Sequence, residues 1–127
     1  MQGRQLFAIA ALCMTSATCA HGHGPATSDS TPLPAVRVHV NNHYKTEMEI
    51  YATGSGTTQR LGLVAPGLER EFDVPQHMVV AGLVTFTAHP SGVGPTVRSD
   101  EIRIRPGDMV DFDIATNLFG TQAWVRP

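Results

Sequence analysis

The sequence predicts an all-β protein: a single antiparallel β-sandwich of about seven strands, following a signal peptide and a flexible spacer. Apolar and polar residues alternate with a period of two in several short segments. Turn signals containing Gly or Pro separate these segments at spacings of about 8–12 residues, as in sandwich domains. No segment has a convincing helical pattern. The 127 residues are enough for one small domain.

The N-terminal residues 1–19 are typical of a secretory signal peptide. Arg4 supplies a positive charge, residues 6–14 are apolar, and small residues follow. The apolar run is too short to cross a hydrocarbon core of about 30 Å as a helix. We therefore expect export, with cleavage before Cys19 or after Ala20.

Residues 20–35 are rich in Gly, Pro, Ser, Thr and His, which predicts a flexible spacer before a domain at 36–127. In the first domain segment, VRVHV, valines alternate with Arg37 and His39 as in a half-buried strand. Patterns of this kind predict seven strands: 36–40, 47–52, 59–64, 70–74, 83–90, 100–106 and 109–115.

Three connections have patterns of their own. The TGSGTT segment at 53–58 predicts a glycine-rich hairpin. Residues 75–82 predict either a short helical turn or a loop. The tail, 116–127, either adds a short strand or packs Phe119 and Trp124 over an open sheet edge.

The domain resembles a group of small, uncharacterised exported bacterial proteins, many of them predicted lipoproteins. The resemblance covers residues 36–114 and rests on VRVHVNNHYKTEMEIYATGSGTTQRLGLV, EREFDVP, TAHPSG and SDEIRIRPGDMVDFDI. These motifs are turns, core positions and strand ends, so they imply a fold and no catalytic residues. More loosely, the domain resembles Ig-like and transthyretin-like modules. Either connectivity fits the alternation, so the strand order stays open.

Processing near residue 20 separates two functional alternatives. Lipidation of Cys19, the favoured interpretation, would anchor the protein to a membrane. Cleavage after Ala20 would instead expose His-Gly-His, whose free amine, backbone amides, His21 and His23 suit Cu(II) or Ni(II). Lipidation acylates the terminus and so excludes this copper site. The simplest alternative gives the two histidines no role.

The remaining histidines are spread through the domain: His39, His43, His77 and His89. His39 and His43 could approach each other, but no carboxylate lies at a spacing typical of a metal site. This pattern favours surface histidines. Asp111 and Asp113 share a strand face, and we expect them to pair with Arg103 or Arg105 on a neighbouring strand.

An outward row of polar and aromatic residues forms a possible surface patch: Tyr44, Glu47, Glu49 and Tyr51. An ordinary solvated strand face explains the same row.

The formal net charge is −2 and Lys45 is the only lysine, so nucleic acid is a poor partner. The sequence contains no convincing set of catalytic residues. We therefore expect a non-enzymatic binding or structural module of the cell envelope. It would be exported, anchored to the outer membrane or periplasmic, without a cofactor, and would contact the membrane only through its lipid. Its partner would be an envelope protein or a glycan. The alternative is a periplasmic copper-binding protein.

Overall fold

The computed structural model of the protein describes residues 31–127. The predicted signal peptide, Cys19, His21, His23 and most of the predicted spacer lie outside the described residues.

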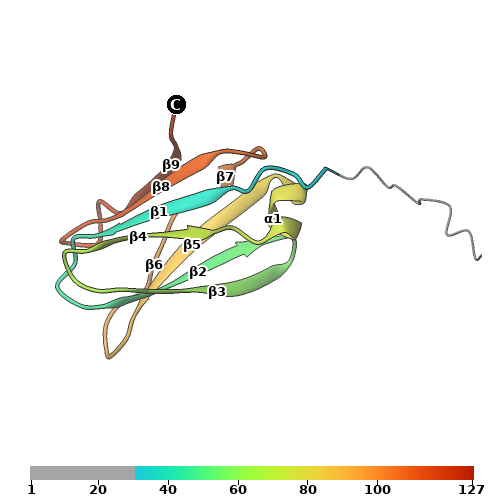
Figure 1. Cartoon of the computed structure of the whole chain (residues 1–127). Helices are drawn as coiled ribbons and strands as arrows, with labels where there is room; N and C mark the ends of the chain where they lie inside the picture. The colour runs from blue at the N-terminus through green and yellow to red at the C-terminus, as the bar shows by residue number, and fades with distance from the viewer. Residues whose placement is uncertain (1–30) are drawn as a thin grey trace, which may run out of the picture. The chain divides into compact units, whose positions relative to one another are not determined.

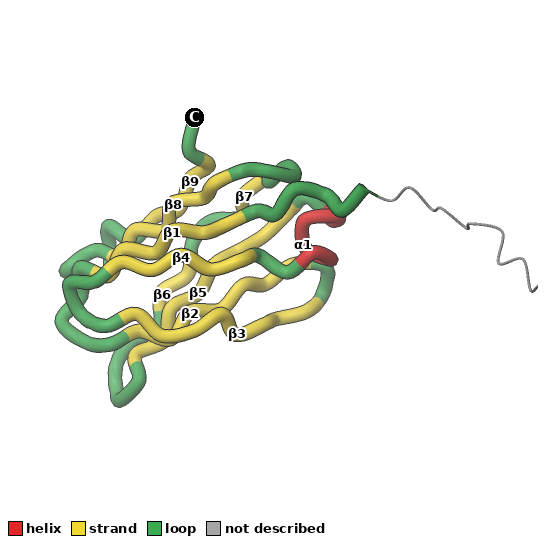
Figure 2. Tube along the Cα trace, viewed as in Figure 1, coloured by secondary structure: helices red, strands yellow, loops and turns green. Residues whose placement is uncertain are grey.

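Two sheets pack face to face as a β-sandwich, which confirms the predicted fold class (Figure 1). One sheet has four strands in the order β4 (Glu69–Asp73), β1 (Arg37–Asn42), β8 (Met109–Ile114) and β9 (Gln122–Val125). The other has the order β3 (Thr57–Val64), β2 (Met48–Gly54), β5 (Leu83–Pro90) and β6 (Val97–Arg98), and β7 (Ile102–Arg103) also pairs with β5. Figure 2 shows the helix α1 (Gln76–Ala81) at one end of the sandwich.

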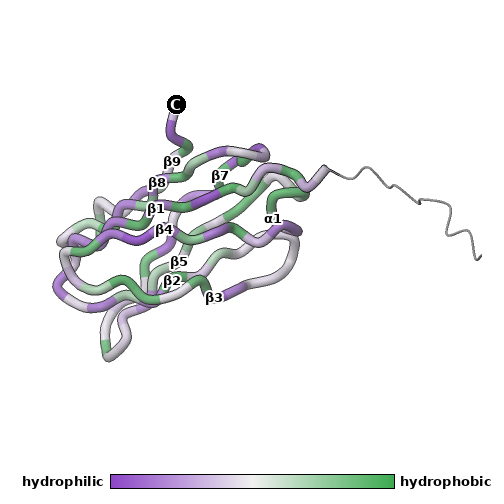
Figure 3. The backbone as a smooth tube through the Cα atoms, viewed as in Figure 1, coloured by the Kyte–Doolittle hydropathy of each residue, from purple (hydrophilic) through white to green (hydrophobic). Residues whose placement is uncertain are grey.

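The apolar side chains of the alternating strands are buried in the core, as predicted. Hydrophobic and hydrophilic residues are interleaved along the strands (Figure 3). Phe86 of β5 and Phe112 of β8 are fully buried, and their ring centroids lie 5.8 Å apart across the interface. Each such buried side chain contributes roughly 1.5–3 kcal/mol of transfer free energy. The two sheets are therefore held together mainly by apolar contact.

The pairing of β1 with β8 is parallel, whereas the other strand pairs of residues 31–127 are antiparallel. Alternation reports which face of a strand is buried but not its direction. A parallel pair needs a crossover connection, and here the whole second sheet is formed between β1 and β8. The expected all-antiparallel arrangement is wrong for this one pair.

The hairpin predicted at 53–58 joins β2 to β3 through Ser55 and Gly56. Both residues have positive φ, 52° and 74°. Two-residue hairpin turns of this handedness match the twist of the flanking strands. The glycine-rich composition therefore has a direct conformational cause.

Three less regular segments are resolved by the structure. Residues 76–81 form α1, which follows Pro75 and ends at Gly82 with φ 77°. The strand predicted at 100–106 is wrong in extent, because only Ile102–Arg103 pairs with β5 before the turn at 105–108 begins. The tail does form the strand β9, and Phe119 is 97% exposed.

Within residues 31–127, no helix has the length and apolar character needed to cross a membrane.

Candidate functional site on the outer face of the four-stranded sheet

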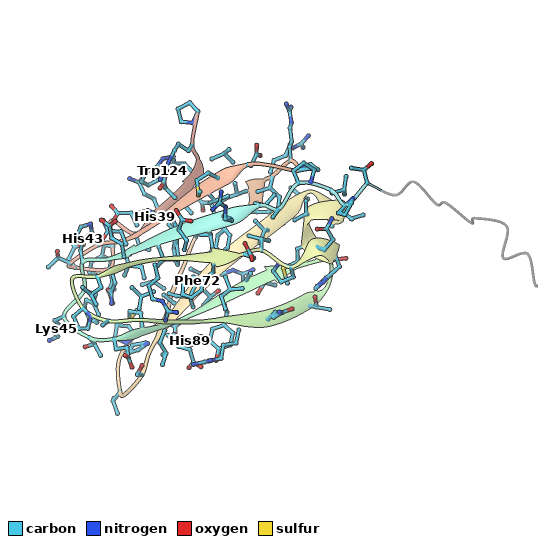
Figure 4. All side chains as sticks on the ribbon, in the orientation of Figure 1. His39, His43, Lys45, Phe72, His89 and Trp124 are labelled. Atoms are coloured by element: carbon cyan, nitrogen blue, oxygen red, sulfur yellow. The ribbon has the colours of Figure 1, made fainter. Side chains whose placement is uncertain are left out.

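The strand register brings side chains from four strands into rows on the outer face of the β4-β1-β8-β9 sheet. One row contains Glu71, His39, Asp111 and Trp124, and the next contains Glu69, Asn41, Asp113 and Gln122. Alternate residues along a strand point to the same face, so both rows face outward while Val40 and Phe112, which lie between the rows, are buried. Figure 4 shows His39, His43 and Trp124 on this part of the molecule, with His89 on the other sheet.

A shallow hollow of about 210 Å³ lies on this face. Its lining comes from β1, β8, β9 and the residues just beyond them: His39, Asn41, His43, Asp111, Phe112, Asp113, Trp124 and Arg126. We call it the sheet-face hollow.

Asp111 forms a bidentate ion pair with the side chain of Arg126. The arginine Nε lies 2.9 Å from Oδ2 and its Nη2 lies 2.5 Å from Oδ1. These hydrogen bonds lower the pKa of Asp111 and outweigh the effect of partial burial, which acts in the opposite direction. The backbone N–H of Arg126 also donates to the carbonyl of Met109 at 2.8 Å. The carboxylate is therefore ionised and fixed in place at neutral pH.

His39 lies between carboxylates from two other strands. Its Nε2 is 3.0 Å from Oε2 of Glu69 on β4, and its Nδ1 is 3.4 Å from Oδ1 of Asp111 on β8. The sequence indicated no carboxylate partner because both partners are distant along the chain. The sheet brings them together, so the imidazole bridges three adjacent strands.

His43 covers part of Asp113. Its Nε2 lies 2.9 Å from Oδ1 of Asp113, within ion-pair distance. The contact is not aligned as a hydrogen bond, and this buried oxygen accepts none from the described part of the chain. The Asp113 side chain is nevertheless 34% exposed, through its other atoms. The Asp113 carboxylate therefore has one buried oxygen that accepts no hydrogen bond from the described residues, while the rest of the side chain is accessible to a ligand.

Asn42 positions the turn that carries His43. Its buried amide donates to the carbonyls of Thr46 at 2.9 Å and Val64 at 3.0 Å, and its Oδ1 accepts from the Tyr44 N–H at 3.0 Å. The His43 backbone N–H donates to the carbonyl of Ile114 at 2.9 Å. The histidine therefore leaves a rigid strand end, while its ring is about half exposed.

Trp124 lies at the open edge of the sheet, opposite Asp111 in register. Trp124 is the only tryptophan of the chain and is 41% exposed, a high value for this large apolar residue type. The sequence prediction placed it over a sheet edge but did not connect it with the aspartates. A large exposed aromatic beside charged groups is a common feature of binding surfaces.

The expected pairing of Asp111 or Asp113 with Arg103 or Arg105 is wrong. β7, which contains Arg103, belongs to the other sheet through its pairing with β5. The prediction assumed that segments consecutive in the chain are neighbours in the same sheet. In the structure, the neighbours of β8 are β1 and β9. The arginine that pairs with Asp111 comes instead from the end of β9.

The predicted surface patch is divided between different surroundings. Glu49 and Tyr51 lie on the outer face of the other sheet, where Glu49 pairs with Arg60 and Tyr51 meets His89 edge-to-face at 5.1 Å. Arg60 lowers the pKa of Glu49, while desolvation and then Glu49 raise the pKa of Tyr51.

The other two patch residues are engaged elsewhere. Glu47 accepts a hydrogen bond from Ser91 at 3.0 Å. Tyr44 packs against the core and lines a separate hollow with Phe119.

Among residues 31–127, no group of three or more His, Cys, Asp or Glu side chains is arranged to hold a metal ion. The copper site predicted at His21 and His23 lies outside the described residues and stays a prediction.

No protein-family model matches the chain, and comparison with curated proteins gives no match. One similar solved structure is the NMR structure of a protein from Eubacterium rectale, with 13% sequence identity and a TM-score of 0.40. The match covers 72% of this chain and 87% of that one. A likeness at this level carries no information about function.

Proposed function

We propose that the protein is a non-enzymatic binding module of the cell envelope, anchored through lipid on Cys19, and that it binds its ligand in the sheet-face hollow. One observation carries this proposal: the accessible part of Asp113 and the 41% exposed Trp124 line the same hollow. A few fixed polar groups beside an exposed aromatic are what a recognition surface requires.

Rigidity also supports binding. Arg126 fixes Asp111, and Asn42 fixes the turn that carries His43. Groups that are already ordered lose little conformational freedom when a ligand arrives.

Co-sedimentation with envelope fragments, purified from cells that produce the protein, tests this function. We expect the wild-type domain to sediment with the fragments, and Trp124→Ala and Asp113→Asn to reduce the bound fraction several-fold. Phe119→Ala and Asp100→Asn are matched controls, because they remove an exposed aromatic and an exposed acid outside the hollow. Equal binding by all variants would contradict a role for this face.

A further inference from the structure

The polar groups of the sheet-face hollow are of both hydrogen-bonding kinds. Asp111 and Asp113 offer acceptor oxygens, Arg126 offers donors, and the Asn41 amide offers both. Within residues 31–127, neither the Asn41 side chain nor Arg126 Nη1 has a hydrogen-bond partner. Hydrogen-bond donors and acceptors that have no partner among the described residues therefore both face the hollow.

This mixture disfavours a ligand with a single charge. An ammonium group would gain only from Asp113, because the charge of Asp111 is already balanced by Arg126. A phosphate or carboxylate would gain from Arg126 but would be repelled by Asp111 and Asp113. A hydroxyl group both donates and accepts, and so it can use either kind of partner.

Asp113 favours a ligand that carries a hydrogen-bond donor. Its Oδ1 is buried and accepts no hydrogen bond from the described residues, although His43 Nε2 lies at 2.9 Å. An acceptor left in this state is unfavourable. The His43 ring is 48% exposed and can turn aside at little packing cost. A ligand hydroxyl could then donate to the freed oxygen.

Trp124 supplies an apolar surface next to these groups. Its exposed indole carries negative charge density on its face, which attracts the slightly positive C–H groups of an approaching ring. The hollow, at about 210 Å³, is smaller than the roughly 300–1,000 Å³ of sites for drug-sized ligands. It suits a single ring, and the open sheet face leaves room for a chain to continue.

We infer that the ligand is a neutral saccharide, with one sugar ring stacked on Trp124 and its hydroxyl groups bonded to Asp113, Asn41 and Arg126. This inference rests on the proposed function and names the chemical class of its ligand.

NMR titration of the isotopically labelled domain tests the inference. The single tryptophan gives one indole N–H signal, so Trp124 can be followed without ambiguity. The probes are oligosaccharides of glucose, mannose, galactose and N-acetylglucosamine, with tetralysine and inorganic phosphate as charged comparisons. We expect at least one oligosaccharide to shift the Trp124 indole signal saturably, together with the amide signals of Asn41 and Asp113.

Variants then locate the binding. Trp124→Ala should weaken the affinity about tenfold, since loss of stacking and apolar contact of this size corresponds to roughly one decade in Kd. Asp113→Asn should weaken it several-fold. Phe119→Ala should leave it unchanged, because this exposed aromatic lies outside the hollow.

The outcomes separate the two proposals. If tetralysine or phosphate shifts these signals and no oligosaccharide does, the saccharide assignment is overturned while the binding face stands. If no probe shifts them but envelope binding still requires Trp124, the saccharide assignment again fails and the proposed function survives. If envelope binding is also unaffected by Trp124→Ala, both fail.

Discussion

Two nitrogen atoms of Arg126 donate hydrogen bonds to the carboxylate of Asp111: Nε lies 2.9 Å from Oδ2 and Nη2 lies 2.5 Å from Oδ1. The pair joins the end of β9 to the middle of β8, and it forms one wall of the sheet-face hollow. The Asp111 side chain is 15% exposed and that of Arg126 is 48% exposed. The contact is therefore partly shielded from solvent, and its contribution to stability can be measured.

Removing this ion pair should have a modest effect on stability. We expect Arg126→Ala to lower the free energy of unfolding only slightly, because solvent screens a pair whose arginine is exposed. A double-mutant cycle with Asp111→Asn, followed by urea unfolding, measures the coupling. Arg103→Ala is the control, and its coupling to Asp111 should be close to zero. A larger coupling to Arg103 would restore the pairing expected from the sequence.

The same pair makes stability depend on acid pH. Arg126 lowers the pKa of Asp111 from its ordinary value of 3.8. A lowered folded-state pKa gives stability that is fully present above the unfolded-state value and is lost as the pH falls through the folded-state value. The stability difference between wild type and Arg126→Ala should therefore be constant at neutral pH and shrink below about pH 4. A difference that persists unchanged at pH 2 would contradict this mechanism.

Phe112 should be among the most sensitive core positions. It is fully buried and packs on Phe86 across the two sheets. Replacing it with Ala leaves a cavity, which typically costs about 3–5 kcal/mol. Chemical unfolding measures this loss, and Phe119→Ala, at a 97% exposed position, should stay within about 0.5 kcal/mol of wild type. Similar losses at both positions would mean that the core is placed wrongly.

The hairpin turn requires a left-handed residue at Gly56. Its φ is 74°, which costs an L-residue about 1–2 kcal/mol. We expect Gly56→Ala to lower the melting temperature, although nothing crowds an added Cβ there. Gly92→Ala is the control, because that glycine also has open space but no positive φ. An equal response at the two sites would exclude backbone conformation as the cause.

Processing of the N-terminus can be decided by intact mass. We expect protein from the membrane fraction of a Gram-negative host to begin at Cys19 and carry acyl groups, and Cys19→Ala to move to the soluble fraction without loss of folding. A mass that begins at His21 without an adduct would contradict the anchor. A Cu(II) titration of wild type and a variant lacking His21 and His23 would then test the alternative.

The fold class, most strand positions and the hairpin at Ser55 and Gly56 could be predicted from the amino-acid sequence alone. Those features are local: period-two alternation selects the buried face of each strand, and glycine-rich turns end it. The outward placement of His39 and Asp111 followed from the same alternation.

Which outward side chains contact one another depends on the order of the strands in the assembled sheet. His39 bridges Glu69 and Asp111 because β1 lies between β4 and β8 in the sheet. Arg126 rather than Arg103 pairs with Asp111 because β9 is the other neighbour of β8. Alternation carries no information about strand order or direction. The sheet-face hollow is lined from three strands and therefore becomes visible only when the sheet is assembled.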